Sequence, residues 1–385
     1  MNQNKIYYLA NARMPTERAH GIQLAKMCEA MIDAGADIEL VLPRRATDKK
    51  SIREFYSLRR DIPVRKIWTL DIYGWGAIGY YIGSVSFMLS YALFFLIKKI
   101  RGERFIIYTI DMDQFSFALV PLLGAPYFVE IHDSKKYSYI YSLLFRNARG
   151  LIVINSLIKN EIVENFKLKN QEKILVFPNG IDINFFNIEI SKEAARKKLN
   201  LSQDVKIALY GGQFYQWKGF EIFPKVAKLL NEKEKPIIAI VGADKHEVLA
   251  GLGMKDFPAN LKFFGKRPYA EMPLWFVAAD ALIVLGTKKS DYSYLHTSPM
   301  KLFEYMAARR PIVAAQTPAI EDVVTQREVF FYEPDNADAM ARIITQALEN
   351  SAEADAKVDG AFAKTAVFSW EKRGKRVYDF VSQNI

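Results

Sequence analysis

Short runs of hydrophobic residues recur along the chain, separated by longer amphipathic or polar stretches. Strands alternating with helices are typical of parallel sheets built from βαβ units, so two series of runs predict an α/β protein with two Rossmann-like sheets. The predicted strands are 5–9, 37–42, 105–110, 126–131, 150–154 and 173–177, then 205–210, 236–241, 261–264, 281–285, 311–315 and 328–331. Helical periodicity lies between many of them, as at 20–34, 218–231 and 299–308.

The two series meet at Pro178-Asn179-Gly180, where a proline and an Asn-Gly pair end a strand in a turn. We expect an N-terminal domain over residues 1–182, a C-terminal domain over 183–365 and a last helix within 366–385. Ligands of open α/β sheets bind at the carboxyl ends of the strands. The expected ligand site is therefore the cleft between the two domains.

Composition narrows the class of protein. The chain has 385 residues, half of them hydrophobic, which allows two full cores and excludes disorder as its main state. Cys28 is the only cysteine, and Met1–Lys5 shows no secretory signal, so we expect a cytoplasmic protein. The net charge is +10, and residues 44–66 hold nine basic and three acidic side chains. This segment is either an ordinary solvated face or a patch for phosphate-bearing partners.

Residues 72–97 form a run of 26 residues without a charge. The run is long enough to span a bilayer. A span would place strands 5–9 and 37–42 on the opposite side of the membrane from 105–110, and one sheet could not form. Two interpretations stay open: a helix buried against the N-terminal sheet, or a partly exposed helix that lies with residues 44–66 on an anionic membrane surface.

The most informative segment is Ser-Pro-Met-Lys-Leu-Phe-Glu-Tyr-Met-Ala, which begins at Ser298 and follows the predicted strand 281–285. Ser298 can cap a helix, and Pro299 suits its first turn. Free backbone amides at a helix start favour an anion such as a diphosphate. Lys301 adds positive charge there. The Glu304 carboxylate lies one turn further, where it can accept hydrogen bonds from ribose hydroxyls.

This segment, followed by Arg-Pro-Ile-Val, resembles the GT-B glycosyltransferases of family 4, which are retaining enzymes that use nucleotide-sugar donors. The resemblance implies two Rossmann-like domains facing each other across a cleft, and a last helix that crosses back to the N-terminal domain. The family often has two glutamates eight positions apart. Glu304 matches the second, and His296 stands in place of the first, at the donor sugar. The donor-binding residues implied here are His296, Ser298, Pro299, Met300, Lys301 and Leu302.

A second likeness is Tyr-Gly-Gly-Gln-Phe-Tyr-Gln-Trp-Lys-Gly, directly after the predicted strand 205–210. Glycines allow the backbone to approach a ligand closely, and Lys218 would balance charge on the leaving diphosphate. The family usually has arginine where Gln213 stands, so this chain would place one cation fewer there. Phe-Phe-Gly-Lys-Arg is a weaker likeness, beside the nucleotide base. The donor-binding residues implied by both are Gly212, Gln213, Gly219, Lys266 and Arg267.

The N-terminal half carries two further likenesses. Glu-Ile-His-Asp ends the predicted strand 126–131 and resembles the family's Glu-x-His segment, in which the histidine lies beside the transferred sugar. A lone histidine after a strand is more often structural, and that alternative stays open. Residues 14–23 resemble the family's first loop. The residues implied are His132 as a catalytic group, Gly21 near the donor, and Arg18, His20 and Asp133 for the acceptor.

Taken together, the patterns predict a retaining glycosyltransferase that moves a sugar from a nucleotide-sugar donor to a glycan or lipid-linked acceptor. We expect a role in bacterial surface polysaccharide or glycoconjugate synthesis, in the cytoplasm or on the inner face of its membrane. His132, Lys218 and Glu304 would carry the chemistry. No cofactor is expected, and no metal, because the Asp-x-Asp spacing of Asp111 and Asp113 belongs to transferases of another fold.

Two alternatives remain. A nucleotide-sugar epimerase or hydrolase of the same fold would act on the donor without an acceptor. A non-catalytic basic protein that binds membrane or nucleic acid would explain the net charge of +10. It would not explain Lys218 and Glu304, each placed after a strand. The chain has no recognisable nucleic-acid module, so we expect no nucleic-acid partner.

Overall fold

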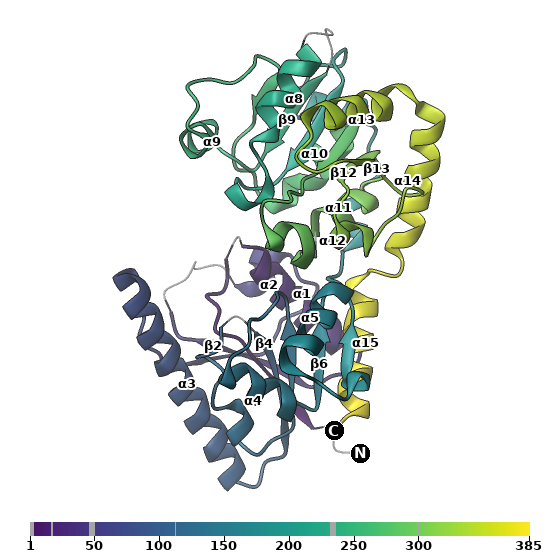
Figure 1. Cartoon of the computed structure of the whole chain (residues 1–385). Helices are drawn as coiled ribbons and strands as arrows, with labels where there is room; N and C mark the ends of the chain where they lie inside the picture. The colour runs from purple at the N-terminus through teal and green to yellow at the C-terminus, as the bar shows by residue number, and fades with distance from the viewer. Residues whose placement is uncertain (1–3, 17, 46–50, 112, 232–235, 299) are drawn as a thin grey trace. The chain divides into compact units, whose positions relative to one another are not determined.

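The computed structural model describes residues 4–16, 18–45, 51–111, 113–231, 236–298 and 300–385. The chain divides into two compact units (Figure 1). The N-terminal unit comprises Met1–Gly180 and Trp370–Ile385, and the C-terminal unit comprises Ile181–Ser369. Each unit has its own hydrophobic core.

A seven-stranded, wholly parallel sheet forms the centre of the N-terminal unit. Its strand order is β3-β2-β1-β4-β5-β6-β7. Strands β2, β5 and β6 are buried along their whole length, which explains why their sequences are continuous hydrophobic runs. The strands are β1 (Lys5–Leu9), β2 (Ile38–Pro43), β3 (Val64–Ile67), β4 (Phe105–Asp111), β5 (Tyr127–Ile131), β6 (Gly150–Val153) and β7 (Ile174–Val176).

Helices connect these strands, and several begin at a side-chain cap. The Ser138 hydroxyl and the Asn155 amide oxygen each accept a hydrogen bond from a backbone amide in the first turn that follows. The last helix of the chain packs against the first, where Gly374 leaves room for Ala30. The helices are α1 (Ala19–Asp33), α2 (Ile52–Tyr56), α3 (Gly76–Ile100), α4 (Tyr139–Asn147), α5 (Ser156–Phe166) and α15 (Trp370–Gln383), with short 3-10 turns η1 (Tyr73–Trp75), η2 (Val120–Leu122) and η3 (Gln171–Lys173).

The C-terminal unit has a six-stranded parallel sheet with the order β10-β9-β8-β11-β12-β13. Its strands are β8 (Ile207–Gly211), β9 (Ile237–Val241), β10 (Leu261–Phe263), β11 (Ala281–Val284), β12 (Ile312–Ala315) and β13 (Phe330–Tyr332). Its helices are α6 (Ile183–Phe186), α7 (Lys192–Lys198), α8 (Ile222–Asn231), α9 (Lys245–Leu252), α10 (Met272–Ala278), α11 (Met300–Ala307), α12 (Pro318–Glu321), α13 (Ala337–Glu349) and α14 (Ser351–Thr365), with η4 (Gln216–Lys218), η5 (Tyr269–Glu271) and a π-helix η6 (Tyr292–His296).

The prediction of an α/β protein with two Rossmann-like sheets is confirmed, and each of the twelve predicted strands is present. The sequence pattern missed β3, an edge strand that is mostly exposed and carries Arg65 and Lys66 in place of a hydrophobic run. The helix predicted over 218–231 was wrong at its start. Gly219 adopts a φ of 78°, which ends a 3-10 turn, and α8 begins only at Ile222.

Both sheets have the same topological switch point. The strand order reverses between β1 and β4 in the N-terminal unit, and between β8 and β11 in the C-terminal unit. Loops after these strands are where open α/β sheets bind their ligands. The residues to examine therefore follow β1, β4, β8 and β11.

Candidate active site

The loop after β8 begins with a close approach of two strand ends. Gly242, which follows β9, has a φ of 106°, and a Cβ built there would lie 2.9 Å from the Gly212 carbonyl oxygen. A side chain at Gly242 would therefore force these strand ends apart. The amide of Gly211 donates a hydrogen bond of 2.9 Å to the hydroxyl of Tyr305, which is fully buried in α11. The β8 loop and α11 are thus held together.

Lys218 lies in the 3-10 turn that ends this loop. Gly219 follows in the left-handed region, and a Cβ there would lie 2.9 Å from Cβ of Thr287, so glycine is required. The Lys218 ammonium lies 5.2 Å and 5.1 Å from the ring centroids of Tyr215 and Trp217. Burial and, to a smaller extent, the charge of Lys301 lower the pKa of Lys218 to about 8, while Glu304 opposes the shift.

Lys301 and Glu304 lie on the same face of α11. The Lys301 ammonium is 2.8 Å from Oε2 of Glu304, at the i, i+3 spacing that brings helix side chains together. Only 3% of the Glu304 side-chain surface is exposed, against 29% for Lys301. The ring hydroxyl of Tyr269 also interacts with the Glu304 carboxylate, which helps to raise the pKa of a tyrosine that burial already raises. Two cations and one held carboxylate therefore share one edge of the C-terminal sheet.

The other predicted donor residues differ in their surroundings. The Gln213 amide oxygen accepts a hydrogen bond of 2.6 Å from the Tyr215 hydroxyl. His296 is buried at the end of the π-helix that precedes α11. The side chain of Leu302 lies in the hydrophobic core, so only its backbone amide can serve a ligand. Ser298 and Met300 are half-buried, and Pro299 lies outside the described residues.

Lys266 and Arg267 follow β10 and are exposed. The Lys266 ammonium is 4.0 Å from a Glu247 oxygen, which is a surface ion pair. The Arg267 guanidinium donates to the Phe264 carbonyl oxygen at 3.0 Å and lies 5.5 Å from the Trp275 ring centroid. Arg267 is therefore held against its own loop, which makes it a packing residue as well as a candidate for the nucleotide base.

In the N-terminal unit, the carboxylate of Glu130 in β5 is wholly buried and surrounded by donors. Its Oε2 accepts hydrogen bonds from the hydroxyls of Tyr108 at 2.6 Å and Tyr8 at 3.2 Å. Its Oε1 accepts from the Gln23 amide at 2.9 Å and from the guanidinium of Arg373. Burial alone would raise the pKa of Glu130, but the Arg373 charge and these hydrogen bonds lower it well below its usual range.

His132, which directly follows β5, completes this network. Its Nε2 lies 2.7 Å from Oε1 of Glu130, and 23% of its side-chain surface is exposed. An ionised carboxylate can only accept a hydrogen bond, so Nε2 must carry the proton. Glu130 therefore fixes the orientation of the imidazole and leaves Nδ1 as the nitrogen available to a neighbour.

Arg373 comes from α15 and joins Glu130 to the segment by which the chain leaves the N-terminal unit. Its side chain is wholly buried, and it donates to the carbonyl oxygens of Phe177 and Pro178 as well as to Glu130. Arg373 and Glu130 are 243 positions apart. The Glu-x-His likeness includes Glu130, but no local signal in the sequence marks Arg373 or its pairing with Glu130, and sequence reasoning missed both.

The first loop carries the predicted acceptor residues. Arg18 is exposed and precedes α1, while His20 is half-buried in its first turn. Burial and, to a smaller extent, the charge of Arg18 lower the pKa of His20 to about 4, so His20 is neutral near pH 7. A Cβ on Gly21 would lie 2.2 Å from the Tyr56 hydroxyl. Packing against Tyr56 therefore explains the glycine at position 21 without any ligand.

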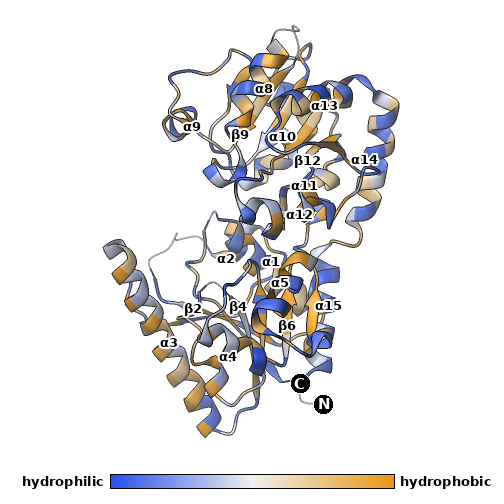
Figure 2. Ribbon diagram, in the orientation of Figure 1, coloured by the Kyte–Doolittle hydropathy of each residue, from blue (hydrophilic) through white to orange (hydrophobic). Residues whose placement is uncertain are grey.

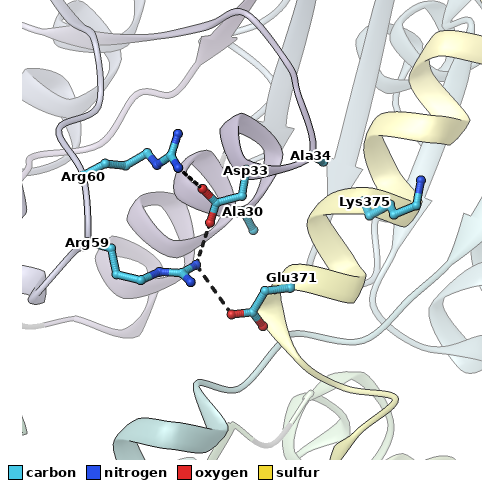
Figure 3. Close-up of a pocket in the computed structure, with 7 residues that line it drawn as sticks. All are labelled: Ala30, Asp33, Ala34, Arg59, Arg60, Glu371 and Lys375. Atoms are coloured by element: carbon cyan, nitrogen blue, oxygen red, sulfur yellow. Dashed lines mark hydrogen bonds and ion pairs between the residues drawn. The ribbon is translucent and has the colours of Figure 1, made fainter.

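Two further features of this unit lie away from the predicted site. Asp113 accepts hydrogen bonds from the Ser116 amide and hydroxyl, so it closes a local turn after β4. Among the residues that the structure describes, no group of three His, Cys, Asp or Glu side chains is placed to hold a metal ion. A cavity of about 580 Å³ lies between α1, α15 and the segment around Arg59, where Arg59 pairs with Asp33 and Glu371, and Arg60 pairs with Asp33 (Figure 3).

The structure thus brings together Lys218, Lys301 and Glu304 in the C-terminal unit, and His132 with Glu130 in the N-terminal unit. His132 and Asp133 directly follow β5, whereas Arg18, His20 and Gly21 belong to the segment after β1. The acceptor role of Asp133 stays a prediction.

Residues 191–362 match the family model described as "Glycosyl transferases group 1". The C-terminal unit therefore carries a group 1 glycosyltransferase domain. Over the whole chain, the crystal structure of Anabaena Alr3699/HepE in complex with UDP is similar, with a TM-score of 0.71 and 17% sequence identity over 98% of this chain and 100% of that one. The prediction of a GT-B fold made of two Rossmann-like domains is confirmed.

Two curated relatives add sequence similarity. D-inositol 3-phosphate glycosyltransferase from Streptosporangium roseum is 25% identical over 226 residues, which cover 54% of this chain and 49% of the relative. The putative teichuronic acid biosynthesis glycosyltransferase TuaC from Bacillus subtilis is 24% identical over 342 residues, which cover 81% of this chain and 80% of that protein. The match to the first relative therefore spans about half of its length.

Proposed function

We propose that this protein is a retaining glycosyltransferase of the family 4 type that takes a sugar from a nucleoside-diphosphate sugar. The observation that carries the proposal is the pair Lys218 and Lys301 at the carboxyl edge of the C-terminal sheet, close enough for one charge to lower the pKa of the other. Two ammonium groups that repel one another are stabilised by a dianionic ligand. A diphosphate between the glycine loop and the start of α11 satisfies both.

In the proposed reaction, the bond between the anomeric carbon and the diphosphate oxygen breaks, and its electron pair leaves with the diphosphate. Lys218, Lys301 and the first amides of α11 stabilise the negative charge that develops there. The acceptor hydroxyl attacks the same face of the sugar, and its proton passes to the departing diphosphate oxygen. The anomeric configuration is retained without a carboxylate nucleophile.

The remaining residues have supporting roles in this proposal. Glu304 accepts hydrogen bonds from hydroxyls of the donor and keeps Lys301 in place. His132, oriented by Glu130, is the catalytic group that the N-terminal unit supplies in this proposal, with Nδ1 as its available nitrogen. The lysines supply the positive charge that a divalent metal supplies in other transferases, so the proposed reaction needs neither metal nor cofactor.

The proposed acceptor is a glycan or a lipid-linked glycan, as in the assembly of a bacterial surface polysaccharide. The name of the TuaC relative, a putative teichuronic acid biosynthesis glycosyltransferase, supports this class of acceptor. Cys28 is a free, buried thiol, which suits the reducing cytoplasm in which we place the protein.

A thermal-shift series with UDP, GDP and ADP, in the presence of EDTA, tests the donor site first. A ligand that binds only the folded state at 100 times its Kd stabilises that state by about 2.7 kcal/mol. We expect a shift with one of the three nucleotides, its loss in Lys218→Ala, and its retention in Lys225→Ala, which removes an exposed lysine from α8. No shift with any nucleotide would contradict the donor site.

Product analysis then separates the proposed reaction from its alternative. With the matching nucleotide sugar and an acceptor, NMR of the product should show the anomeric configuration of the donor. An inverted product would contradict the retaining mechanism. Turnover of the donor at full rate without any acceptor would instead identify an epimerase or a hydrolase of the same fold.

A further inference from the structure

Helix α3 reverses the usual pattern of a surface helix, because its exposed side is apolar. Steps of three and four positions join its most outward side chains, which places them along one face of the helix. Their exposed fractions run from 39% at Ile82 to 76% at Ile100. We call this row the α3 stripe, and it consists of Ile78, Ile82, Val85, Leu89, Leu93, Leu96 and Ile100.

The opposite face of α3 packs on the N-terminal unit with glycine, serine and aromatic residues. Gly83, Ser84, Phe87 and Tyr91 are buried there, and Phe95 stacks on Phe105 of β4 at 5.2 Å. By length and composition α3 could cross a membrane, and 33% of its most apolar window is buried. Figure 1 shows it at the margin of the unit, and Figure 2 shows hydrophobic residues along its length. Contiguous exposed apolar surface of this kind marks an interaction site.

The charges and aromatic rings at the two ends of α3 identify the partner. Its carboxyl end and the following turn carry Lys99, Arg101 and Arg104, whereas Lys98 pairs with Glu103 at 2.6 Å. Trp75 and Tyr81, near the other end, are also exposed. An uncharged apolar stripe bounded by tryptophan, tyrosine and basic side chains matches the boundary between lipid headgroups and acyl chains.

The basic segment 44–66 contributes less positive charge than its composition predicts. Arg53 pairs with Asp61, and Arg59 and Arg60 both pair with Asp33 beside α15. Arg65 lies 5.6 Å from the Phe94 ring centroid on α3, but it also pairs with Glu39. These four arginines therefore pair with carboxylates of the same unit, and the role of segment 44–66 toward an anionic partner stays a prediction.

We propose that the α3 stripe lies in the plane of an anionic lipid membrane and docks the N-terminal unit on it. The helix does not cross the bilayer, because the strands on both sides of it in sequence belong to one sheet: β2 pairs with β3, and β1 pairs with β4. Only residues 101–104 separate α3 from β4. This docking goes beyond the transferase proposal and does not depend on it.

A second copy of the chain fits the α3 stripe less well than lipid does. In an antiparallel pair of α3 helices, the basic carboxyl end of each would face the uncharged aromatic end of the other. In a parallel pair, the two basic ends would repel. Neither arrangement has charge complementarity, whereas anionic headgroups provide it along the whole basic end.

Flotation of the full chain with lipid vesicles tests the proposal without any sugar. The vesicles contain equal parts of phosphatidylglycerol and phosphatidylcholine, and a second set contains phosphatidylcholine alone. We expect binding to the anionic vesicles and weaker binding to the neutral ones. Leu89→Glu/Leu93→Glu should bind about a hundredfold more weakly, because two half-exposed leucines lose their transfer into lipid. Met254→Glu/Val367→Glu, on exposed positions of the C-terminal unit, should bind like the wild type.

Circular dichroism and the thermal shift with the nucleotide that binds the wild type are measured on the same samples. The two double variants change exposed residues, so the fold and the donor site should stay intact. Wild type that stays unbound at low salt would overturn the proposal, and so would equal binding by Leu89→Glu/Leu93→Glu. The wild type could instead bind no vesicles and sediment as a dimer in the analytical ultracentrifuge, while Leu89→Glu/Leu93→Glu sediments as a monomer. That result would show that a second copy covers the α3 stripe. If the wild type bound vesicles but showed no thermal shift with any nucleotide, the proposed donor site would be overturned and the membrane docking would stand.

Discussion

The two units of this protein share one sheet topology but build their candidate functional groups in opposite ways. In the C-terminal unit, Lys218, Lys301 and Glu304 come from two short segments, and both lysines keep some exposed surface. In the N-terminal unit, His132 depends on Glu130, which is buried and held by residues from β1, β4, α1 and α15. One site consists of two partly exposed lysines beside a buried carboxylate, and the other of a histidine held by a buried network.

The difference predicts how each site fails when it is altered. Removing Lys218 leaves the ion pair between Lys301 and Glu304 in place, so activity should fall while the fold keeps its stability. Removing the Glu130 charge leaves Arg373 as an unbalanced buried cation, so stability and activity should fall together. The following changes test that contrast, from the largest expected effect to the smallest.

Lys218→Ala should lower turnover by about 100- to 1,000-fold, the range for the loss of one preorganised group that stabilises developing charge. Thermal unfolding should be unchanged within about 0.5 kcal/mol, because the side chain makes no ion pair on which the core depends. Steady-state rates and a melting curve measure both effects. A large loss of stability would show that the C-terminal site is a buried network too, and the comparison between the units would fail.

Glu130→Gln should destabilise the protein by about 3–5 kcal/mol at pH 7, because Arg373 keeps its charge without a partner. The low pKa of Glu130 adds stability above the ordinary carboxyl pKa of about 4.3, and this contribution is lost as the pH falls below it. Urea unfolding at pH 7 and pH 3.5 should therefore show a smaller gap between variant and wild type at the lower pH.

The double variant Glu130→Gln/Arg373→Met serves as the control for this network. It removes both charges, so it should lose less stability than the two single variants added together. Turnover should still be low in the double variant, because the imidazole of His132 has lost the carboxylate that orients it. Full turnover would mean that His132 has no role in the reaction.

Lys301→Ala should raise the pKa of Lys218 from about 8, because it removes a like charge next to a half-buried ammonium. The affinity for the nucleoside diphosphate requires the charged form of Lys218, so wild-type affinity should fall as the pH rises through 8. In Lys301→Ala this fall should move to higher pH, and binding at pH 7 should be about tenfold weaker. Calorimetric titrations between pH 6.5 and 10 measure it, with Lys301→Arg as the variant that keeps the wild-type profile.

Tyr305→Phe removes the hydroxyl that accepts the Gly211 amide and should cost about 1 kcal/mol of stability. Because this bond ties α11 to the β8 loop, the affinity for the nucleotide should fall as well. Tyr332→Phe is the matched control, since its hydroxyl donates to a backbone carbonyl at 3.4 Å in the same core. Equal nucleotide affinity in the two variants would show that Tyr305 contributes only packing.

The residues of the proposed C-terminal site could be predicted because they lie close together along the chain. Ser298–Glu304 and Gly211–Gly219 each follow one strand, and strand ends of a parallel sheet meet at one edge. The periodic pattern also predicted the strands whose residues are buried on both faces. It missed β3, because an exposed edge strand needs no hydrophobic run.

Local patterns of hydrophobicity, glycine and charge therefore determined the fold class, the position of the glycine loop and the residues of the lysine pair. The tertiary structure alone decided which distant residues meet. It placed Arg373 against Glu130 across 243 positions, paired the arginines of the basic segment within the unit, and turned the apolar stripe of α3 outward. The physical reason is that periodicity fixes the faces of an element, whereas burial depends on what the rest of the chain packs against each face.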